Sequence, residues 1–367
     1  MIYLDHGATS MEKPVRVVRA MERAVRMCGN PGRGGHRASM EGARTVFHCR
    51  ELAARLFECD EDRVVFTSNC THGLNIAIGS LVKPGSRVLI SGFEHNAVTR
   101  PLTALGVRLE VAGRRLFDSE DTLQRFEDGL RRGVDGAVFT HASNVFGYVL
   151  PIKEMAALCQ QYGVPFVIDA AQSAGTKPVS LRELGASYIA MPGHKGLLGP
   201  QGTGILLCGD VPKPLLYGGT GTASQSQQMP EELPERLEAG TVNVPGIAGL
   251  AAGMEYVLER GVDTIGQRQA RVAGFCAREL ARNGVRVFAG PGQGGTVSFV
   301  PKMDCETMAQ KLAERGIAVR AGLHCAPLAH ESAGTLESGT VRASFGHNAE
   351  IWQAKTLIRA VLELDVM

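Results

Sequence analysis

The feature that most constrains the fold is a regular alternation of short apolar runs and helical segments between residues 63 and 208. The runs are rich in β-branched and aromatic residues, and in chain order they read RVVFTS, SRVLIS, VRLEVAG, GAVFTHAS, PFVIDAA, SYIAM and GILLC. Helical segments such as THGLNIAIGSLV and IKEMAALCQQYG lie between several of them. Strands that alternate with helices form a mainly parallel sheet with helices on both faces. We therefore predict a doubly wound α/β fold, in which ligands bind at the carboxyl ends of the strands.

The composition changes after residue 208. Residues 217–235, YGGTGTASQSQQMPEELPE, are rich in Gly, Ser and Gln and indicate a loop. Strand-like TVSFV, IAVRAG and TVRASFG then alternate with helical segments, which is typical of a smaller α+β domain. We place the large domain at 13–245 and the smaller domain at 1–12 and 246–367.

Charge and cysteine content limit the possible partners and sites. The net charge is +2, so we expect no nucleic acid or anionic membrane as a partner. No apolar run is long enough to span a bilayer, and MIYLDHGATS does not resemble a signal peptide, so we expect a cytoplasmic protein. The nine cysteines are scattered and include no CxxC pair, which argues against disulfides and against a metal site.

Two residues at neighbouring strand ends suggest a cofactor. Asp169 ends the apolar run FVID, and a buried carboxylate is costly unless a cation or strong donors surround it. Lys195 follows the next run, within the glycine-rich GHKGLLGPQGTG. A lysine can form a Schiff base with pyridoxal phosphate, and an acid can keep the ring nitrogen protonated. From these two residues alone, a structural salt bridge is the alternative.

Other polar residues follow strands of the predicted sheet. Thr71 opens a helix, where it can contact a phosphate or simply belong to a capping turn. His95 follows RVLIS, although a lone histidine is more often structural. Asn144 lies in HASNVFG, where a turn is the default interpretation, and Gln172 lies just beyond Asp169.

Taken together and in order, the motifs resemble a known family. They are YLDHGATS, RGGHRAS, EHNA, SNVFG, DAAQSAG, GHKGLLGPQGTG, RLEAGTVN, RAGLHC and VRASFG. This set resembles the class V aminotransferases, and within them the cysteine desulfurase branch, which also contains selenocysteine lyases. The resemblance covers nearly the whole chain and implies a fold type I pyridoxal-phosphate-dependent enzyme.

The resemblance implies a role for each matching residue. Lys195 would be the Schiff-base lysine, Asp169 the partner of the pyridine nitrogen, and His95 the catalytic residue that stacks on the ring and moves protons. The implied cofactor contacts are Cys70, Thr71, His95, Asn144, Asp169, Gln172, His194, Lys195 and, across a homodimer, Thr241. The implied substrate contacts are Arg342, Asn144 and His36.

Cys325 would be the nucleophile that takes sulfur from the substrate as a persulfide. It lies beside His324 in RAGLHCAPLAHESAG, and a nearby histidine can hold a thiolate. An inert buried cysteine is the alternative, which fits the other eight better. The fairly short connection to Arg342 resembles the group whose persulfide loop is short and ordered.

The sequence departs from the family pattern at four positions. Pro192 stands where relatives usually have Ser or Thr, and His72 stands where many have Glu. His6 and Gly7 replace the Asn and Ala of a common LDNAATS motif. These departures bear on cofactor affinity and substrate preference.

The implied reaction converts L-cysteine to L-alanine and passes sulfur to an acceptor. The acceptor would be an iron–sulfur assembly scaffold, a thiol carrier or a thiolation enzyme. The alternatives are a selenocysteine lyase, another aminotransferase or β-lyase of this fold, and a non-catalytic scaffold subunit of a sulfur-carrier complex.

Overall fold

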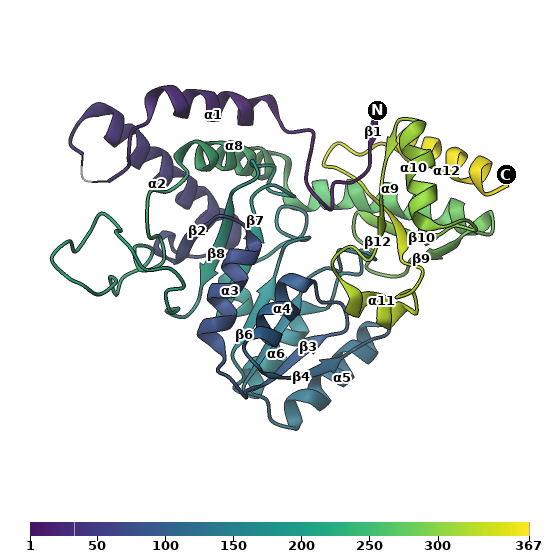
Figure 1. Cartoon of the computed structure of the whole chain (residues 1–367), viewed down its shortest axis with the longest axis horizontal. Coiled ribbons are helices and arrows are strands. Elements are labelled where there is room, and N and C mark those ends of the chain that lie inside the picture. The colour runs from purple at the N-terminus through teal and green to yellow at the C-terminus, as the bar shows by residue number, and fades with distance from the viewer. Residues whose placement is uncertain (33, 367) are drawn as a thin grey trace.

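One seven-stranded sheet organises the larger part of the structure (Figure 1). The computed structural model describes residues 1–32 and 34–366. The strand order is β2-β8-β7-β6-β5-β3-β4, and β8 runs antiparallel to both of its neighbours. The strands are β2 (Val64–Thr67), β3 (Arg87–Ser91), β4 (Arg108–Ala112), β5 (Gly136–Thr140), β6 (Phe166–Asp169), β7 (Tyr188–Pro192) and β8 (Gly204–Cys208). The predicted mainly parallel α/β sheet is confirmed, and each predicted run contains one strand.

Helices pack on both faces of this sheet. Every residue of β5 and β6 is buried, as expected for central parallel strands, whereas β4 at the edge is partly exposed. The helices of this part are α1 (Val15–Met27), α2 (Arg37–Phe57), α3 (Cys70–Leu81), α4 (Asn96–Ala104), α5 (Ser119–Arg131), α6 (Ile152–Gln161), α7 (Leu181–Leu184) and α8 (Val244–Arg260), with a 3-10 turn, η1, at Glu61–Arg63.

The smaller part contains a four-stranded antiparallel sheet in the order β12-β13-β10-β9. Figure 1 shows it at the right, with the N-terminal strand beside the C-terminal helices. Its strands are β9 (Arg286–Phe288), β10 (Thr296–Val300), β12 (Arg320–Gly322) and β13 (Thr340–Ser344), and β1 (Ile2–Tyr3) pairs separately with β11 (Ile317–Ala318). Its helices are α9 (Val262–Arg282), α10 (Cys305–Glu314), α11 (Pro327–Ala333) and α12 (Ile351–Val366).

The packing of α8 bears on the domain boundary. Ile247, Leu250 and Met254 of this helix are buried in the same core as the large sheet. The smaller part has its own core, to which α9 and α12 contribute. We therefore propose that the boundary lies near Gly261, between α8 and α9, rather than after residue 245.

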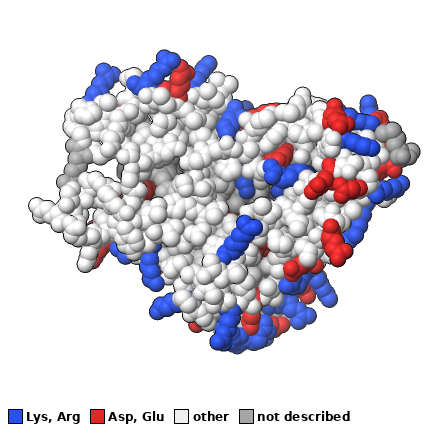
Figure 2. All heavy atoms as spheres, in the orientation of Figure 1, with Lys and Arg blue, Asp and Glu red and all other residues white. Residues whose placement is uncertain are grey.

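The surface carries both signs of charge. Figure 2 shows Lys, Arg, Asp and Glu side chains interspersed over the lower and right-hand parts of the visible face, and fewer of them on the left. Across the described residues, no helix has the length and apolar character that a membrane span requires.

Candidate active site

One pocket at the carboxyl ends of the parallel strands contains most of the predicted site residues. The large sheet brings these ends to one edge, as expected for parallel strands. Eight predicted cofactor contacts line this pocket: Cys70, Thr71, His95, Asn144, Asp169, Gln172, His194 and Lys195. Although they lie far apart in the sequence, the fold gathers them around one space.

Asp169 ends β6 and is almost completely buried, with 3% of its surface exposed. Its Oδ1 accepts a hydrogen bond from the backbone N–H of Ala171 at 2.9 Å and a weaker one from the Cys70 thiol at 3.6 Å. Oδ2 accepts none from the described residues. Because Asp169 lines the pocket, it has a carboxylate oxygen for a cationic group bound there.

Lys195 is half-buried and lies in the turn that follows β7. Burial lowers the pKa of its amine, the cations Arg342 and Arg320 lower it further, and Asp169 opposes them. A lysine with a lowered pKa is a better nucleophile and base near neutral pH. Lys195 therefore has the electrostatic environment that covalent chemistry on an aldehyde requires.

His95 is the N-cap residue of α4. Its Nδ1 accepts a hydrogen bond from the backbone N–H of Ala97 at 2.9 Å, so the neutral ring carries its proton on Nε2. Burial lowers the pKa of His95, which Asp169 partly opposes. The ring lines the pocket, where it can stack on a flat ligand and donate or accept a proton through Nε2.

The N-terminus of α3 forms the other end of the pocket. The side chain of Asn69 caps this helix through the N–H of His72 at 2.9 Å, and Thr71 lies in the first turn. A helix N-terminus with a threonine hydroxyl suits an anion such as phosphate. His194 lies nearby with its Nδ1 2.9 Å from the Thr9 hydroxyl, and burial lowers its pKa to about 4.

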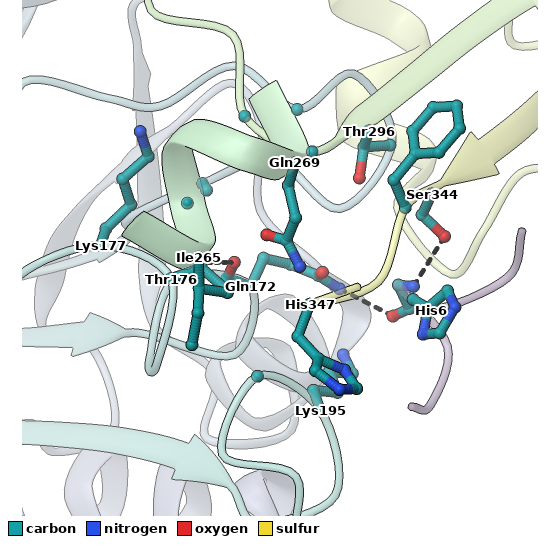
Figure 3. A pocket seen from close by; sticks show the side chains of 18 of the residues that line it. His6, Gln172, Thr176, Lys177, Lys195, Ile265, Gln269, Thr296, Ser344 and His347 are labelled. Atoms are coloured by element: carbon teal, nitrogen blue, oxygen red, sulfur yellow. Dashed lines mark hydrogen bonds between the residues drawn. The ribbon is translucent and has the colours of Figure 1, made fainter. Parts of the chain in front are cut away.

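Gln172 connects this pocket to a second cavity. Its Nε2 donates to the carbonyl oxygen of Gly7 at 3.0 Å (Figure 3). Figure 3 also shows Lys195 and His347 on the walls of this second cavity, which lies between the N-terminal segment and α9. Since an amide nitrogen has two hydrogens, Gln172 keeps one for a ligand in the first pocket.

Arg342 projects from β13 and is 2% exposed. Its Nη2 donates to Oδ1 of Asp5 at 2.8 Å, and its Nη1 donates to the carbonyl oxygen of Asn144 at 3.0 Å. The buried Nε has no partner among the described residues. The guanidinium thus lies beside Asn144 and retains donors for a further carboxylate.

Cys325 is the exposed cysteine among nine free ones. It lies in a tight turn in which Ala326 N–H donates to the Leu323 carbonyl at 2.9 Å. His324 and Cys325 both have positive φ angles, 52° and 55°, which non-glycine residues rarely adopt. Burial, with Arg342 next in effect, lowers the pKa of His324 to about 3, so this histidine is neutral and supplies no cation to a thiolate.

Arg342 and Cys325 do not line the first pocket, although they contact Asn144 and Asn96 beside it. Two further predicted residues, Thr241 and His36, lie away from it in the single chain. Thr241 is exposed and lines a separate pocket with parts of α2 and the 219–221 loop. His36 is exposed and caps α2, accepting from the N–H of Ser39 at 3.4 Å. Their predicted roles at the cofactor and the substrate therefore require a second subunit, and they stay predictions.

Sequence reasoning gave no role to three residues that the structure places at the site. Asp5 pairs with Arg342 and Arg320, and the backbone N–H of Asn96 contacts the cysteine turn. Asp5 lies in the motif YLDHGATS and Arg320 lies in the motif RAGLHC, so both belong to motifs that the sequence analysis named. Their pairing joins residues 315 positions apart and has no local signature.

Comparison with known proteins agrees with this geometry. The model of the family described as Aminotransferase class-V matches residues 2–357. The chain belongs to the class V aminotransferase family. It is 34% identical to a probable cysteine desulfurase of Methanothermobacter thermautotrophicus over 94% of this chain and 89% of that one. It is 33% identical to a probable cysteine desulfurase of Pyrococcus abyssi over 99% and 94%.

A solved structure matches the fold closely. The apo structure of a cysteine desulfurase from Thermococcus onnurineus NA1 has a TM-score of 0.90 and 30% identity, covering 100% of this chain and 94% of that one. This match confirms the fold type I assignment. Class V aminotransferases use pyridoxal phosphate, which is the predicted cofactor.

The pocket fits this cofactor. It offers an available carboxylate oxygen on Asp169 for the ring nitrogen and a lysine amine of lowered pKa for the aldehyde. It also offers a helix N-terminus with Thr71 for the phosphate. Pro192 lines the pocket and has no hydroxyl, so Thr71, His194 and backbone N–H groups would carry the phosphate binding.

Proposed function

We propose that this chain is a pyridoxal-phosphate-dependent cysteine desulfurase that converts L-cysteine to L-alanine and retains the sulfur on Cys325. The observation that carries the proposal is the placement of Cys325. It is exposed, whereas the other cysteines are buried or half-buried. Its backbone carbonyl accepts a hydrogen bond from the N–H of Asn96, which is next to His95 in the chain. A thiol with this placement distinguishes a desulfurase from an ordinary aminotransferase, which needs none.

The bound cofactor would supply an aldehyde for the amino group of the substrate and an electron sink for the α-carbon. We expect Arg342 and Asn144 to hold the α-carboxylate, because the guanidinium lies against Asn144 and has donors left over. We expect Lys195 to remove the proton from the α-carbon, because its lowered pKa makes the neutral amine available as a base. His95 can return protons through Nε2.

Cys325 then attacks the sulfur of the substrate as a thiolate. A sulfur–sulfur bond forms and the carbon–sulfur bond of the substrate breaks. The electron pair of the broken bond stays with the substrate carbon, which takes a proton to become the methyl group of alanine. L-cysteine and a protein thiol thus give L-alanine and a protein persulfide. Because His324 is neutral, it supplies no cation to this thiolate, and we expect Arg320, which precedes the cysteine turn, to support it.

We further propose a homodimer in which Thr241 and His36 complete the site of the partner. Support comes from large apolar side chains that are exposed on α2 and on the loop after β8: Met40, Phe47, Leu215, Leu216 and Tyr217. Figure 2 shows few charged side chains on the left-hand part of the molecule, where Figure 1 places α2 and the long loop. Such a surface is typical of an interface between subunits.

We also propose a cytoplasmic location and a sulfur acceptor that is a thiol or a carrier protein, with iron–sulfur cluster assembly as one pathway served. All nine cysteines lie in the described part of the chain and none forms a disulfide, which suits a reducing compartment. An exposed persulfide can be reached by a thiol acceptor.

The test is a turnover assay with L-cysteine and L-selenocysteine side by side, with and without a reducing thiol. The wild-type holoenzyme should form alanine from L-cysteine and have a visible absorption band that borohydride bleaches. Lys195→Ala should lose both properties. A colourless wild type that binds no pyridoxal phosphate after reconstitution would overturn the proposal, and turnover of selenocysteine alone would favour a selenocysteine lyase.

A further inference from the structure

The carboxylate of Asp5 lies between two arginines of the smaller sheet. Its Oδ2 accepts from Nε and Nη2 of Arg320 at 3.0 and 2.9 Å, and its Oδ1 accepts from Nη2 of Arg342 at 2.8 Å. Asp5 is nearly buried, Arg342 is buried, and the side chain of Arg320 is about half exposed. One carboxylate from the N-terminal segment therefore forms ion pairs with two arginines.

The strand register explains why this carboxylate is needed. Arg320 on β12 and Arg342 on β13 are direct partners across an antiparallel pair. Like charges directly opposite each other are unfavourable. Among the described residues, Asp5 is the acid that forms an ion pair with either of them, so the three side chains together carry a net charge of +1.

The two arginines lie beside different parts of the site. Both contribute to lowering the pKa of the Lys195 amine, although burial has the largest effect. Arg342 contacts Asn144, at the end assigned to the α-carboxylate. Arg320 precedes the cysteine turn, and its carbonyl oxygen lies 3.3 Å from Nε2 of His324, so it lies at the end of the site assigned to the side chain of the substrate.

We propose that Asp5 is a specificity-determining residue, which reduces the charge of the site to +1 and so selects amino acids with one carboxylate over those with a second anionic group. The inference rests on the proposed function, because that function assigns the two ends of the site. A second anion on the substrate would lie beside Arg320, where the carboxylate of Asp5 both offsets the cation and repels the anion. Cysteine, neutral in its thiol form, meets no such penalty.

The experiment compares equilibrium binding of L-alanine and L-aspartate to the holoenzyme by calorimetry. The two ligands differ by one carboxylate, so the ratio of their Kd values measures selection against the second charge. In Asp5→Asn this ratio should move about tenfold in favour of L-aspartate, because one nearby charge is removed. Asp5→Glu keeps the charge and should retain a ratio near that of the wild type.

Two further variants separate charge selection from a structural role. Glu12→Gln changes another acid of the N-terminal segment, which accepts from Asn348 rather than from the arginines, and should leave the ratio unchanged. Arg320→Gln removes the half-exposed cation and should shift the ratio against L-aspartate. This variant keeps the test decisive if Asp5→Asn does not fold.

A purely structural role for Asp5 predicts that both Kd values change together, and an unchanged ratio in Asp5→Asn would overturn the proposal. So would a ratio that does not respond to Arg320→Gln. Turnover of L-cysteine by the wild type is measured in parallel. Its absence would count against the proposed function, whereas normal turnover with an unchanged ratio counts against the role of Asp5 alone.

Discussion

The backbone N–H of Asn96 donates a 2.7 Å hydrogen bond to the carbonyl oxygen of Cys325. A second bond of the same length runs from Nδ2 of Asn144 to the carbonyl oxygen of His324. Two successive carbonyls of the cysteine turn are thus held by the first residue of α4, which follows β3, and by the loop that follows β5. The turn itself belongs to the smaller part of the molecule, so these bonds hold Cys325 next to His95 and Asn144, two residues that line the pocket.

This arrangement predicts the effect of Asn144→Ala. Loss of the side-chain bond should free one of the two anchored carbonyls, so backbone amide exchange at residues 323–326 should become faster, by roughly fivefold for a bond worth about 1 kcal/mol. Hydrogen exchange followed by mass spectrometry on the substrate-free protein measures this. Asn348→Ala, which changes an asparagine bonded to Glu12, is the matched control. Unchanged exchange at 323–326 would show that Asn144 does not hold the turn.

The fold was largely predictable because parallel strands have a local signature. Each of the seven apolar runs contains one strand. Asp169 is the last residue of β6, and Lys195 follows β7, the strand beside it. Chemistry at strand ends can therefore be read from short stretches of sequence. The same reasoning placed Thr71 at a helix N-terminus, where the structure has it, and His95 after a strand, where it caps α4.

The interactions between distant segments were not predictable. The pairing of Asp5 with Arg342 depends on the bridge between Asp5 and Ser344 at the end of β13. Arg320 faces Arg342 because of strand register, which a single sequence does not state. The neutral state of His324 follows from burial, which only the folded chain provides.

Asp169→Ala separates a cofactor partner from a structural ion pair. The variant should still bind pyridoxal phosphate, because the lysine and the phosphate contacts remain, but turnover should fall by about a hundredfold or more. Turnover per bound cofactor is the measurement. Cys70→Ala, which removes a thiol bonded to the same carboxylate, should lose much less. If activity per bound cofactor stays normal in Asp169→Ala, the carboxylate has only a structural role.

Glu94 predicts a dependence of stability on pH. Its buried carboxyl accepts from the N–H groups of Thr140 and Ser91 at 3.0 and 3.3 Å, and burial raises its pKa from 4.5 to about 8. The folded state therefore holds this proton up to about pH 8, whereas the unfolded state releases it near 4.5. The contribution to stability is complete below the lower value and is lost as pH rises through the higher one.

The free energy of unfolding, measured with urea, should accordingly fall between pH 5.5 and 8.5. Each pKa unit corresponds to about 1.4 kcal/mol. Glu94→Gln keeps an acceptor oxygen but cannot ionise, so its profile should be flatter over this range. Parallel profiles for the two proteins would mean that Glu94 is already ionised in the folded state.

Thr241 predicts a link between cofactor affinity and assembly. It is exposed and lies outside the pocket of its own chain, so it can reach a phosphate only in a partner subunit. Cofactor affinity should therefore decrease as the protein is diluted below its dimer dissociation constant. Thr241→Ala should weaken binding by about tenfold, the loss expected for a charge-assisted hydrogen bond. A monomer in dilute solution that binds the cofactor at full affinity would contradict this.

Cys325→Ser tests the step that separates desulfuration from other chemistry of this fold. Serine cannot form a persulfide, so the variant should bind pyridoxal phosphate and L-cysteine, seen as a change in cofactor absorption, but form almost no alanine. Mass spectrometry should find no persulfide on the protein. Cys28→Ser, at a half-buried cysteine next to Thr45, is the control and should retain both activity and persulfide.

L-selenocysteine gives the contrast, because its carbon–selenium bond is weaker and selenium can leave without attack. If the Ser variant keeps selenocysteine turnover while losing cysteine turnover, Cys325 is the sulfur acceptor. If it retains full activity with L-cysteine, the persulfide assignment is wrong, and the chain acts as a lyase or aminotransferase.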